Sequence, residues 1–383
     1  MNILVVKLSA IGDVVHTLPS LAALRKLYPH AHITWVIEEA ASDLIKGHPD
    51  LDRVIISRRK RWTSEIKKGR ISVFKEVGQF IRELRSRRYD LVIDFHGLLK
   101  SAVIVFLSSG KRKLGYDSMQ EMSGLFLTEK IPEDMDKHAV GRYLDLVHYL
   151  RRKDSAPNGN IGRQGVNDAE ACVEEPAFLI PVTEEEEKKV ARLLKLKGMG
   201  ESGFVAVSPV ALWETKLWEE QNFARLCDLI YLKYALPVVF TGAEKESIAR
   251  IRAQMKTPAV SLAGETSLRE LAGLYRRAAL VISTDSGPMH IAAAVGTPVV
   301  ALFGPTDPAR TGPYGKGHRV IQKELPCSPC FLKKCASREC MRQITVEEAF
   351  QTAGGLLEMK TLQLGGEDVI HRAAKEDETH QID

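Results

Sequence analysis

The sequence predicts an α/β protein with two Rossmann-like domains that face a cleft, and three observations support this fold class. Short apolar runs alternate with segments of helical periodicity in both halves of the chain, as expected for parallel sheets with helical crossovers. The chain has 383 residues, which is more than one hydrophobic core usually organises. A polar stretch at residues 151–175 separates the halves and is typical of a linker or an exposed insertion.

The first half begins with a continuous apolar strand at residues 2–7. A turn with Gly12 and Asp13 follows, and then a helix with regularly spaced leucines. The alternation continues with strands at residues 32–39, 51–57 and 90–97 and an amphipathic helix at residues 73–89. We assign residues 1–175, linker included, to an N-terminal domain.

The second half opens with a helix at residues 182–198, whose acidic start and basic end suit the helix dipole better than they suit a metal site. After it, strands are expected at residues 204–209, 236–242, 259–264 and 280–284, with helices at residues 222–232, 244–255 and 267–278. We assign residues 176–355 to a C-terminal domain and residues 356–383 to a polar tail.

Residues 283–315 predict a strand, a turn, a helix from about Met289 and a second strand. In a parallel sheet, such a turn presents free backbone N–H groups and the positive end of a helix dipole, which suit a diphosphate. Asp285 is interpreted as the helix cap, Gly287 as a point of close ligand approach and His290 as a phosphate or sugar contact. A cap, a turn glycine and a structural histidine remain the alternative.

Composition indicates a globular protein, with 44% hydrophobic and 27% charged residues. No apolar run approaches the roughly 18 residues of a transmembrane helix, and the first apolar stretch is too short for a signal peptide. We therefore expect a cytoplasmic protein with no transmembrane segment.

Residues 53–88 are strongly basic, with 13 Lys or Arg against three Glu. Such a patch suits nucleic acid, anionic lipid headgroups or a phosphorylated substrate. For residues 73–88 a solvated helix face explains the charge. Residues 58–62 (RRKRW) are predicted to be a loop, where four cations and an indole are more easily explained by binding.

Two motifs are set aside because their surroundings do not fit. GMGESG at residues 198–203 matches a dinucleotide fingerprint, but it follows a helix and precedes a strand, so we interpret it as a helix terminator and expect no nicotinamide cofactor. The D-x-D pairs at residues 50–52 and 134–136 do not follow strand ends and are predicted to be surface carboxylates.

Four cysteines lie within 14 residues in the pattern C-x2-C-x4-C-x4-C, namely Cys327, Cys330, Cys335 and Cys340. In a cytosolic chain this density favours a structural metal over disulfides, although the spacing is tight for a zinc knuckle. Reduced thiols and disulfides remain alternatives.

Two long motifs, at residues 6–19 (VKLSAIGDVVHTLP) and 285–308 (DSGPMHIAAAVGTPVVALFGPTDP), resemble signatures of glycosyltransferase family nine, the bacterial lipopolysaccharide heptosyltransferases. The resemblance extends from Met1 to about Ala349, apart from the insertion. It implies the GT-B fold, with an acceptor-binding N-terminal domain and a C-terminal domain that binds a nucleotide sugar.

The resemblance also implies site residues. Asp13 corresponds to the proposed catalytic base, Lys216 to a phosphate-binding cation and Thr266 to a residue beside adenine. Glu246 corresponds to a ribose contact, with Glu244 as the alternative. Two threonines of one family branch are replaced here by Ala211 and Leu212. The remaining donor contacts are expected at Asp285, Ser286, Gly287 and His290, and the acceptor contacts at Lys7, Arg59, Lys60, Arg61, His96 and Lys100.

The implied activity is inverting transfer of heptose from ADP-L-glycero-D-manno-heptose to the inner core, a Kdo-lipid A-like anionic glycolipid, at the inner face of the inner membrane. No cofactor is expected for catalysis. One alternative is another GT-B enzyme with a different donor, or a sugar-nucleotide epimerase. The other is a non-enzymatic nucleic-acid-binding protein, although few aromatic residues are interleaved with the basic ones; we expect no nucleic-acid partner.

Overall fold

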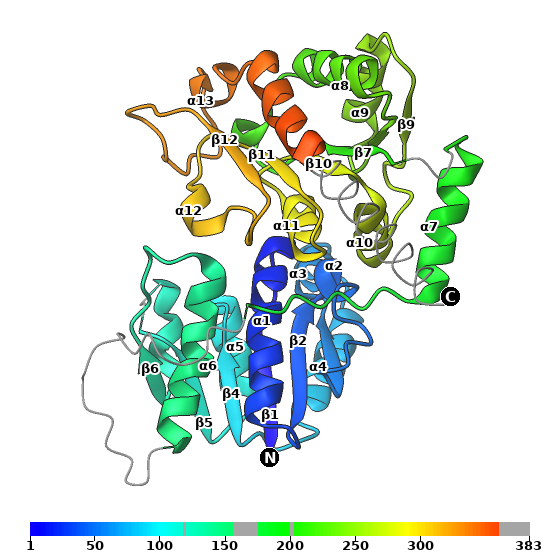
Figure 1. The fold of residues 1–383 in the computed structure, drawn as a ribbon. Coiled ribbons are helices and arrows are strands. Elements are labelled where there is room, and N and C mark those ends of the chain that lie inside the picture. The colour runs from blue at the N-terminus through cyan, green and yellow to red at the C-terminus, as the bar shows by residue number, and fades with distance from the viewer. Residues whose placement is uncertain (118–119, 156–174, 200–202, 360–383) are drawn as a thin grey trace, which may run out of the picture. The chain divides into compact units, whose positions relative to one another are not determined.

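The computed structural model describes residues 1–117, 120–155, 175–199 and 203–359. The chain divides into two compact units (Figure 1). The N-terminal unit comprises residues 1–183 with 267–269 and 309–311, and the C-terminal unit comprises the rest. Each unit contains one parallel sheet of six strands, which confirms the predicted α/β class.

The N-terminal sheet has the order β3-β2-β1-β4-β5-β6. Its strands are β1 (Asn2–Val6), β2 (His32–Glu38), β3 (Arg53–Ser57), β4 (Leu91–Asp94), β5 (Arg112–Tyr116) and β6 (Glu129–Ile131). The helices are α1 (Ile11–Leu27), α2 (Glu39–Ser42), α3 (Arg59–Lys67), α4 (Val73–Leu84), α5 (Leu99–Leu107), the 3₁₀ helix η1 (Gln120–Phe126) and α6 (Ala139–Ser155).

Helices cover both faces of this sheet (Figure 1). The face that carries Leu4 and Val6 packs against α3, α4 and α5 through a core that includes Trp62, Phe80 and Val105. On the other face, α1 packs against α6. Alternate residues of each strand are therefore buried in opposite layers, which explains the continuous apolar runs in the sequence.

The C-terminal sheet has the order β12-β11-β10-β7-β8-β9. Its strands are β7 (Val205–Ser208), β8 (Val238–Phe240), β9 (Ala259–Ser261), β10 (Leu280–Thr284), β11 (Val299–Phe303) and β12 (Arg319–Gln322). The helices are α7 (Glu184–Leu196), η2 (Glu214–Lys216), α8 (Glu220–Tyr234), α9 (Lys245–Gln254), α10 (Leu268–Arg277), α11 (Gly287–Ala294), α12 (Pro308–Thr311) and α13 (Glu339–Arg342), followed by a helical segment at residues 346–359.

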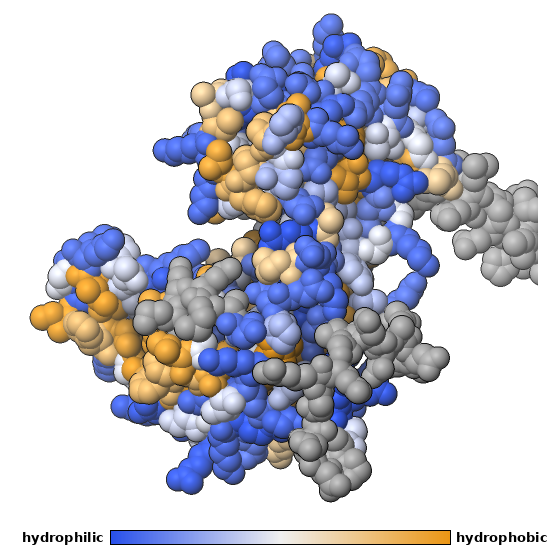
Figure 2. Space-filling model, turned by 90° about the vertical axis from the view of Figure 1, so that its left-hand side faces the viewer, coloured by the Kyte–Doolittle hydropathy of each residue, from blue (hydrophilic) through white to orange (hydrophobic). Residues whose placement is uncertain are grey.

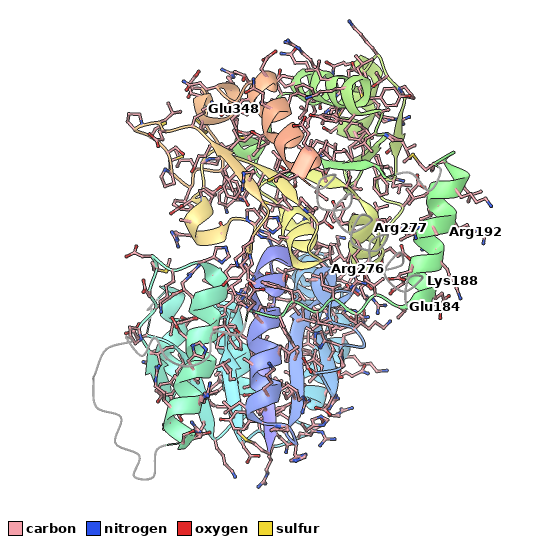
Figure 3. The ribbon with its side chains drawn as sticks, in the orientation of Figure 1. Glu184, Lys188, Arg192, Arg276, Arg277 and Glu348 are labelled. Atoms are coloured by element: carbon pink, nitrogen blue, oxygen red, sulfur yellow. The ribbon has the colours of Figure 1, made fainter. Side chains whose placement is uncertain are left out.

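Acidic residues at the start of α7 form ion pairs with nearby basic residues. Glu184 pairs with Lys188 one turn later at 2.6 Å (Figure 3), and Glu187 reaches Arg276 of α10 at 3.4 Å. The carboxylates thus suit the helix dipole and its neighbours, as the sequence predicts. Gly198 ends the helix with a φ of +77°, as expected of a terminator, whereas residues 200–202 of that motif lie outside the described residues.

Three sequence interpretations are wrong in part. Residues 58–62 are not a loop, because α3 begins at Arg59. The predicted linker starts too early, because α6 continues to Ser155; residues 156–174 lie outside the described residues. Helix α11 starts at Gly287, two positions before the predicted Met289. Of the D-x-D carboxylates, Asp52, Asp134 and Asp136 are exposed, as predicted, whereas Asp50 is partly buried.

Candidate active site

Both sheets have the strand order of a doubly wound fold, in which the chain first builds one side of the sheet and then returns to build the other. The order reverses between β1 and β4 in the first unit and between β7 and β10 in the second. Ligands of such sheets bind at the carboxyl ends of the strands beside the reversal. Asp13 follows β1 and His96 follows β4, whereas Lys216 follows β7 and Asp285 follows β10.

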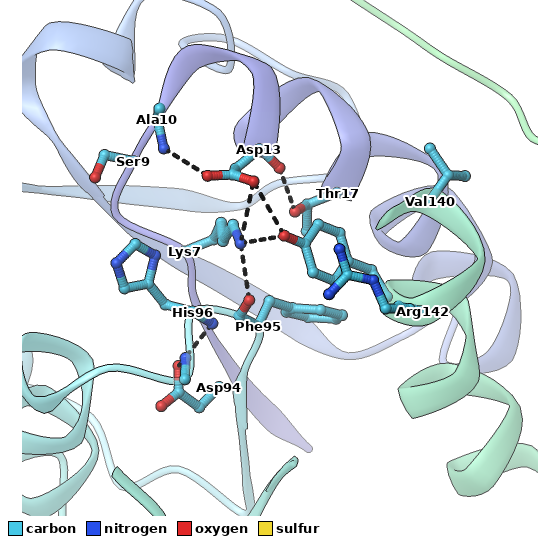
Figure 4. Close-up of polar contacts among 12 residues, drawn as sticks. Lys7, Ser9, Ala10, Asp13, Thr17, Asp94, Phe95, His96, Val140 and Arg142 are labelled. Atoms are coloured by element: carbon cyan, nitrogen blue, oxygen red, sulfur yellow. Dashed lines mark hydrogen bonds and ion pairs between the residues drawn. The ribbon is translucent and has the colours of Figure 1, made fainter. Parts of the chain in front are cut away.

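The Asp13 carboxylate is held by three partners (Figure 4). Oδ2 accepts a hydrogen bond from the backbone N–H of Ala10 at 3.0 Å. Oδ1 accepts one from the Tyr143 hydroxyl at 3.2 Å and lies 4.0 Å from the Lys7 ammonium. One oxygen therefore caps the start of α1 and the other takes part in a buried polar network, so the cap and the functional interpretation do not exclude each other.

Lys7 and Tyr143 complete this network. The Lys7 side chain is 3% exposed, and its ammonium donates to the Tyr143 hydroxyl at 2.6 Å and to the Phe95 carbonyl at 2.9 Å. These contacts direct Lys7 toward Asp13 and the protein interior, whereas the sequence interpretation gave it to the acceptor. Tyr143 lies on α6, 130 residues from Asp13 in the chain, and no motif in the sequence indicated it.

The network sets the protonation state of its members. Burial alone would raise the pKa of Asp13, but the Lys7 charge, the Ala10 N–H and the Tyr143 hydroxyl outweigh it and hold that pKa below its ordinary value. Burial and the Asp13 charge raise the pKa of Tyr143 well above its ordinary value, so its hydroxyl keeps its proton and remains a donor. Asp13 is therefore an ionised carboxylate at neutral pH.

His96 lies beside the same network. Burial, helped by the charges of Lys7 and Lys100, lowers its pKa to about 3, so the imidazole is neutral at physiological pH. Both ring nitrogens are buried and have no hydrogen-bond partner among the described residues. A neutral imidazole can donate from one nitrogen and accept at the other, so His96 can bind a hydroxyl group.

Three predicted acceptor residues converge on one buried carboxylate. Glu38, 4% exposed at the end of β2, lies 3.1 Å from Arg59, 3.6 Å from Lys60 and 3.8 Å from Lys100. The Lys100 ammonium also donates to the Ser9 hydroxyl at 2.9 Å. One carboxylate cannot balance three cations, so this group, which we call the basic cluster, keeps an excess of positive charge.

The basic cluster continues along α3. A hollow of about 330 Å³ is lined by Arg59, Lys60, Thr63, Ser64 and Lys67 of this helix. Cations and hydroxyls facing one hollow suit a ligand that carries carboxylates or phosphates.

Arg61 and Trp62 contact Glu76 of α4 and do not have the binding roles that the sequence predicted. Arg61 pairs with Glu76 of α4 at 2.7 Å, and the Trp62 indole N–H donates to the same carboxylate at 3.2 Å. The Trp62 side chain is 9% exposed and packs edge-on against Phe80. The prediction that the Trp62 indole serves binding is therefore wrong, because it anchors α3 to α4.

In the C-terminal unit, Asp285 joins two other site residues. Its carboxylate is 2.5 Å from the Lys216 ammonium and accepts a hydrogen bond from Thr306 at 2.6 Å. Ser286, not Asp285, is the N-cap residue of α11, so the capping interpretation of Asp285 is wrong. The ion pair links the loop after β7 to the turn after β10, and Thr306, which sequence reasoning did not select, comes from the loop after β11.

The other predicted donor residues lie on the same edge of this sheet. Thr266 follows β9, Glu246 is exposed in the first turn of α9 after β8, and Ser286 and Gly287 begin α11. His290, 7% exposed, lies within α11. Because β9, β8, β7, β10 and β11 are consecutive in a parallel sheet, the segments that follow them succeed one another along its carboxyl edge.

The clustered cysteines do not form a metal centre as placed. In the part of the chain that the structure describes, no three His, Cys, Asp or Glu side chains are grouped to hold an ion. Cys327, Cys330, Cys335 and Cys340 are free thiols, and only Cys340 is buried. The structural-metal hypothesis remains a prediction that the geometry of the described residues does not support.

The fold and these residues are those of a two-unit α/β enzyme with a polar site at each strand-order reversal. The chain belongs to glycosyltransferase family 9 (heptosyltransferase), whose model matches residues 77–341. It is 28% identical over 344 residues to lipopolysaccharide heptosyltransferase 1 of Pseudomonas aeruginosa, covering 88% of this chain and 87% of the relative. The predicted family and the assignment as a glycosyltransferase are confirmed.

Solved structures show the same fold. A family 9 glycosyl transferase from Veillonella parvula has a TM-score of 0.76 at 24% identity, covering 94% of this chain and 97% of that one. An Escherichia coli heptosyltransferase with ADP-2-deoxy-2-fluoro heptose has a TM-score of 0.64 at 25% identity, covering 92% and 98%. The GT-B fold is therefore confirmed. Within the described ranges, no helix combines the length and apolar character needed to cross a bilayer.

Proposed function

We propose that the enzyme transfers heptose from ADP-L-glycero-D-manno-heptose to the Kdo-lipid A-like inner core of lipopolysaccharide, with inversion at the anomeric carbon. The observation that carries this proposal is the ionised Asp13 carboxylate, held by Lys7 and Tyr143 at the strand-order reversal of the first unit. The name of the Pseudomonas aeruginosa relative supports the pathway. The sugar nucleotide with the Escherichia coli structure supports the donor.

In the proposed reaction, an acceptor hydroxyl attacks the anomeric carbon from the face opposite the diphosphate. Its proton passes to Asp13, a new C–O bond forms, and the bond to ADP breaks. Lys216, the backbone N–H groups of Ser286 and Gly287 and the dipole of α11 stabilise the charge that grows on the leaving diphosphate. We expect no metal in this reaction, because hydrogen bonds from Lys216 and the backbone, together with the helix dipole, can stabilise the diphosphate.

For the rest of the donor, we assign Glu246 to the ribose, Thr266 to the adenine and His290 to the phosphate or sugar. For the acceptor, we assign Arg59, Lys60, Lys100 and His96, which lie in or beside the basic cluster. Lys7 and Arg61 are left out of this set, because their contacts with Tyr143 and Glu76 direct them elsewhere.

The activity is tested by incubating the enzyme with ADP-heptose and defined core acceptors and recording the product by mass spectrometry. A panel of ADP-, UDP- and GDP-sugars distinguishes heptosyl transfer from the alternative GT-B enzymes. A mass increase of one heptose with the ADP donor alone is expected. Transfer from UDP- or GDP-sugars only, or epimerisation without transfer, would refute the donor assignment.

Neutralising the basic cluster is expected to weaken acceptor binding selectively. The double variant Arg59→Gln and Lys60→Gln should raise KM for the glycolipid about 30-fold, at about 1 kcal/mol per cation near an anionic surface, and leave KM for ADP-heptose unchanged. Lys75→Gln is the matched control, because Lys75 is an exposed cation of the neighbouring α4. If RNA affinity falls while acceptor kinetics stay flat, the cluster serves nucleic acid instead.

We also propose that the enzyme works at the inner face of the inner membrane, attached peripherally. Leu99, Val103 and Phe106 recur on one side of α5 and are 51%, 45% and 55% exposed, and Leu125 of η1 is 57% exposed. Hydrophobic side chains gather on this unit in Figure 2. Lys100 of the basic cluster lies on the same α5, so the apolar stripe begins beside excess positive charge, as anionic bilayer surfaces favour.

The stripe is tested by co-sedimentation with vesicles of phosphatidylglycerol and phosphatidylethanolamine. The double variant Val103→Ser and Phe106→Ser is expected to reduce vesicle binding several-fold because apolar area is lost. Leu232→Ser in the C-terminal unit is the matched control, because Leu232 is 72% exposed on α8. Equal losses in both variants would show that this stripe is not the contact surface.

A further inference from the structure

The cysteine-rich segment, residues 327–340, is attached to the loop that carries Lys216. The Thr215 hydroxyl, which is buried, donates to the Leu332 carbonyl at 2.7 Å. The Arg338 guanidinium donates to the Glu214 carbonyl at 3.3 Å and to the Glu219 carboxylate at 3.2 Å. The segment therefore fixes the first two residues of the short η2 turn in which Lys216 lies, and also contacts Glu219 just before α8.

The same segment is attached to the loop that carries Thr306. Backbone N–H groups of Cys330 and Phe331 donate to the Pro305 carbonyl at 3.0 and 2.8 Å, and the Ser328 hydroxyl donates to the Gly304 carbonyl at 2.6 Å. A Cβ atom at Gly304 would lie 2.6 Å from the Met341 sulfur and 3.1 Å from the Cys340 sulfur, so glycine permits this close approach. Lys216 and Thr306 both contact the Asp285 carboxylate. The segment therefore stabilises the two loops that hold this carboxylate.

The cysteine-rich segment also brings a second lysine, Lys333, to the tryptophan that Lys216 contacts. The Lys216 ammonium lies 4.6 Å from the centre of the Trp213 ring, and the Lys333 ammonium lies 5.3 Å from the same centre. Both distances are within the range of cation–π attraction. One indole therefore holds two ammonium groups, one from the loop after β7 and the other from the cysteine-rich segment.

The two lysines differ in whether a carboxylate neutralises their charge. Lys216 is 15% exposed and paired with Asp285, so this pair has no net charge. Lys333 is exposed and forms no ion pair with any carboxylate of the described residues. Nearby, the loop has no hydroxyl at residues 211 and 212, because Ala211 and Leu212 occupy these positions and Leu212 is 97% exposed. A diphosphate bound here would meet one neutralised cation and one available cation.

We propose that Lys333 is a second phosphate-binding cation of the donor site and contacts the terminal phosphate of a nucleoside diphosphate. This inference rests on the proposed donor site at Lys216 and Asp285. The cysteine-rich segment then has a role in binding, because it places Lys333 over Trp213.

Calorimetry with ADP and with AMP tests the proposal. Lys333→Met is expected to raise the dissociation constant of ADP about tenfold, with a smaller salt dependence, because one charge-assisted contact is lost. AMP affinity should change less than twofold, since AMP lacks the terminal phosphate. Lys333→Arg should retain most of the ADP affinity. Lys334→Met is the matched control, because Lys334 is the adjacent exposed lysine of the same segment.

Lys216→Met, measured in parallel, separates the two possible failures. If Lys216→Met weakens ADP binding but Lys333→Met behaves like Lys334→Met, the role of Lys333 is refuted and the donor site stands. If neither variant weakens ADP binding, the donor site itself is refuted. Equal losses of ADP and AMP affinity in Lys333→Met would indicate a general disturbance of the segment and would also refute a contact with the terminal phosphate.

Discussion

Asp13→Asn is expected to lower kcat by about 10²–10⁴-fold while the dissociation constant for ADP changes no more than about threefold. Asparagine can still accept a hydrogen bond from the Ala10 N–H, so the start of α1 should persist. It cannot take a proton from the acceptor hydroxyl, so the chemical step should fail. Steady-state kinetics with the glycolipid acceptor and calorimetry with ADP measure the two effects separately.

The effects of Asp13→Asn are compared with those of Tyr143→Phe. It removes a hydrogen bond that lowers the pKa of Asp13, so that pKa should rise and the acid limb of the kcat/KM profile should move to higher pH. The loss in kcat should be much smaller than for Asp13→Asn, because the carboxylate remains. Near-normal turnover in Asp13→Asn would show that Asp13 is only a helix cap.

Lys216→Met is expected to weaken ADP binding on the order of 10²-fold. The loss has two sources, because the variant removes a cation from the diphosphate and leaves the Asp285 carboxylate, 6% exposed, without its counter-ion. Adding Asp285→Asn should recover part of the affinity, since the unpaired buried charge is then gone. Calorimetry on the two single variants and the double variant measures this coupling.

Two results would contradict this prediction. Unchanged ADP affinity in Lys216→Met would move the donor site away from the loop after β7. Equal affinity losses in Lys216→Met and in the double variant would show that Asp285 does not face the ligand. A melting curve for each variant distinguishes these results from unfolding, because the ion pair joins two loops of the C-terminal unit.

The sequence predicted those parts of the fold that depend on local patterns. The strands at residues 2–6 and 280–284 are continuous apolar runs buried on both faces, and each ends in a turn with its own helix-starting residues. Asp13 and Asp285 were therefore placed at strand ends from the sequence alone, whereas Lys216 was selected through the family resemblance. Strand β6 (EKI) was not predicted, because it is short and charged and Glu129 is held in place by Arg112 of β5.

Other features depend on contacts between distant segments. Tyr143 and Lys333 reach their sites through α6 and the cysteine-rich segment, and neither lies in a recognisable motif. The loop predicted at residues 58–62 is helical because Trp62 packs into the core, while Arg59 finds a counter-charge in Glu38. Composition alone showed four cations and could not show where their carboxylate partners lie.

The low pKa of Asp13 has a consequence for the timing of the reaction. A carboxylate below its ordinary pKa is a weak base, and it gains a proton from an alcohol only after that oxygen has begun to bond to carbon. In the proposed reaction, we therefore expect proton transfer to Asp13 to lag behind bond formation at the anomeric carbon. We expect the leaving diphosphate to be stabilised before that proton moves, by Lys216 and the start of α11.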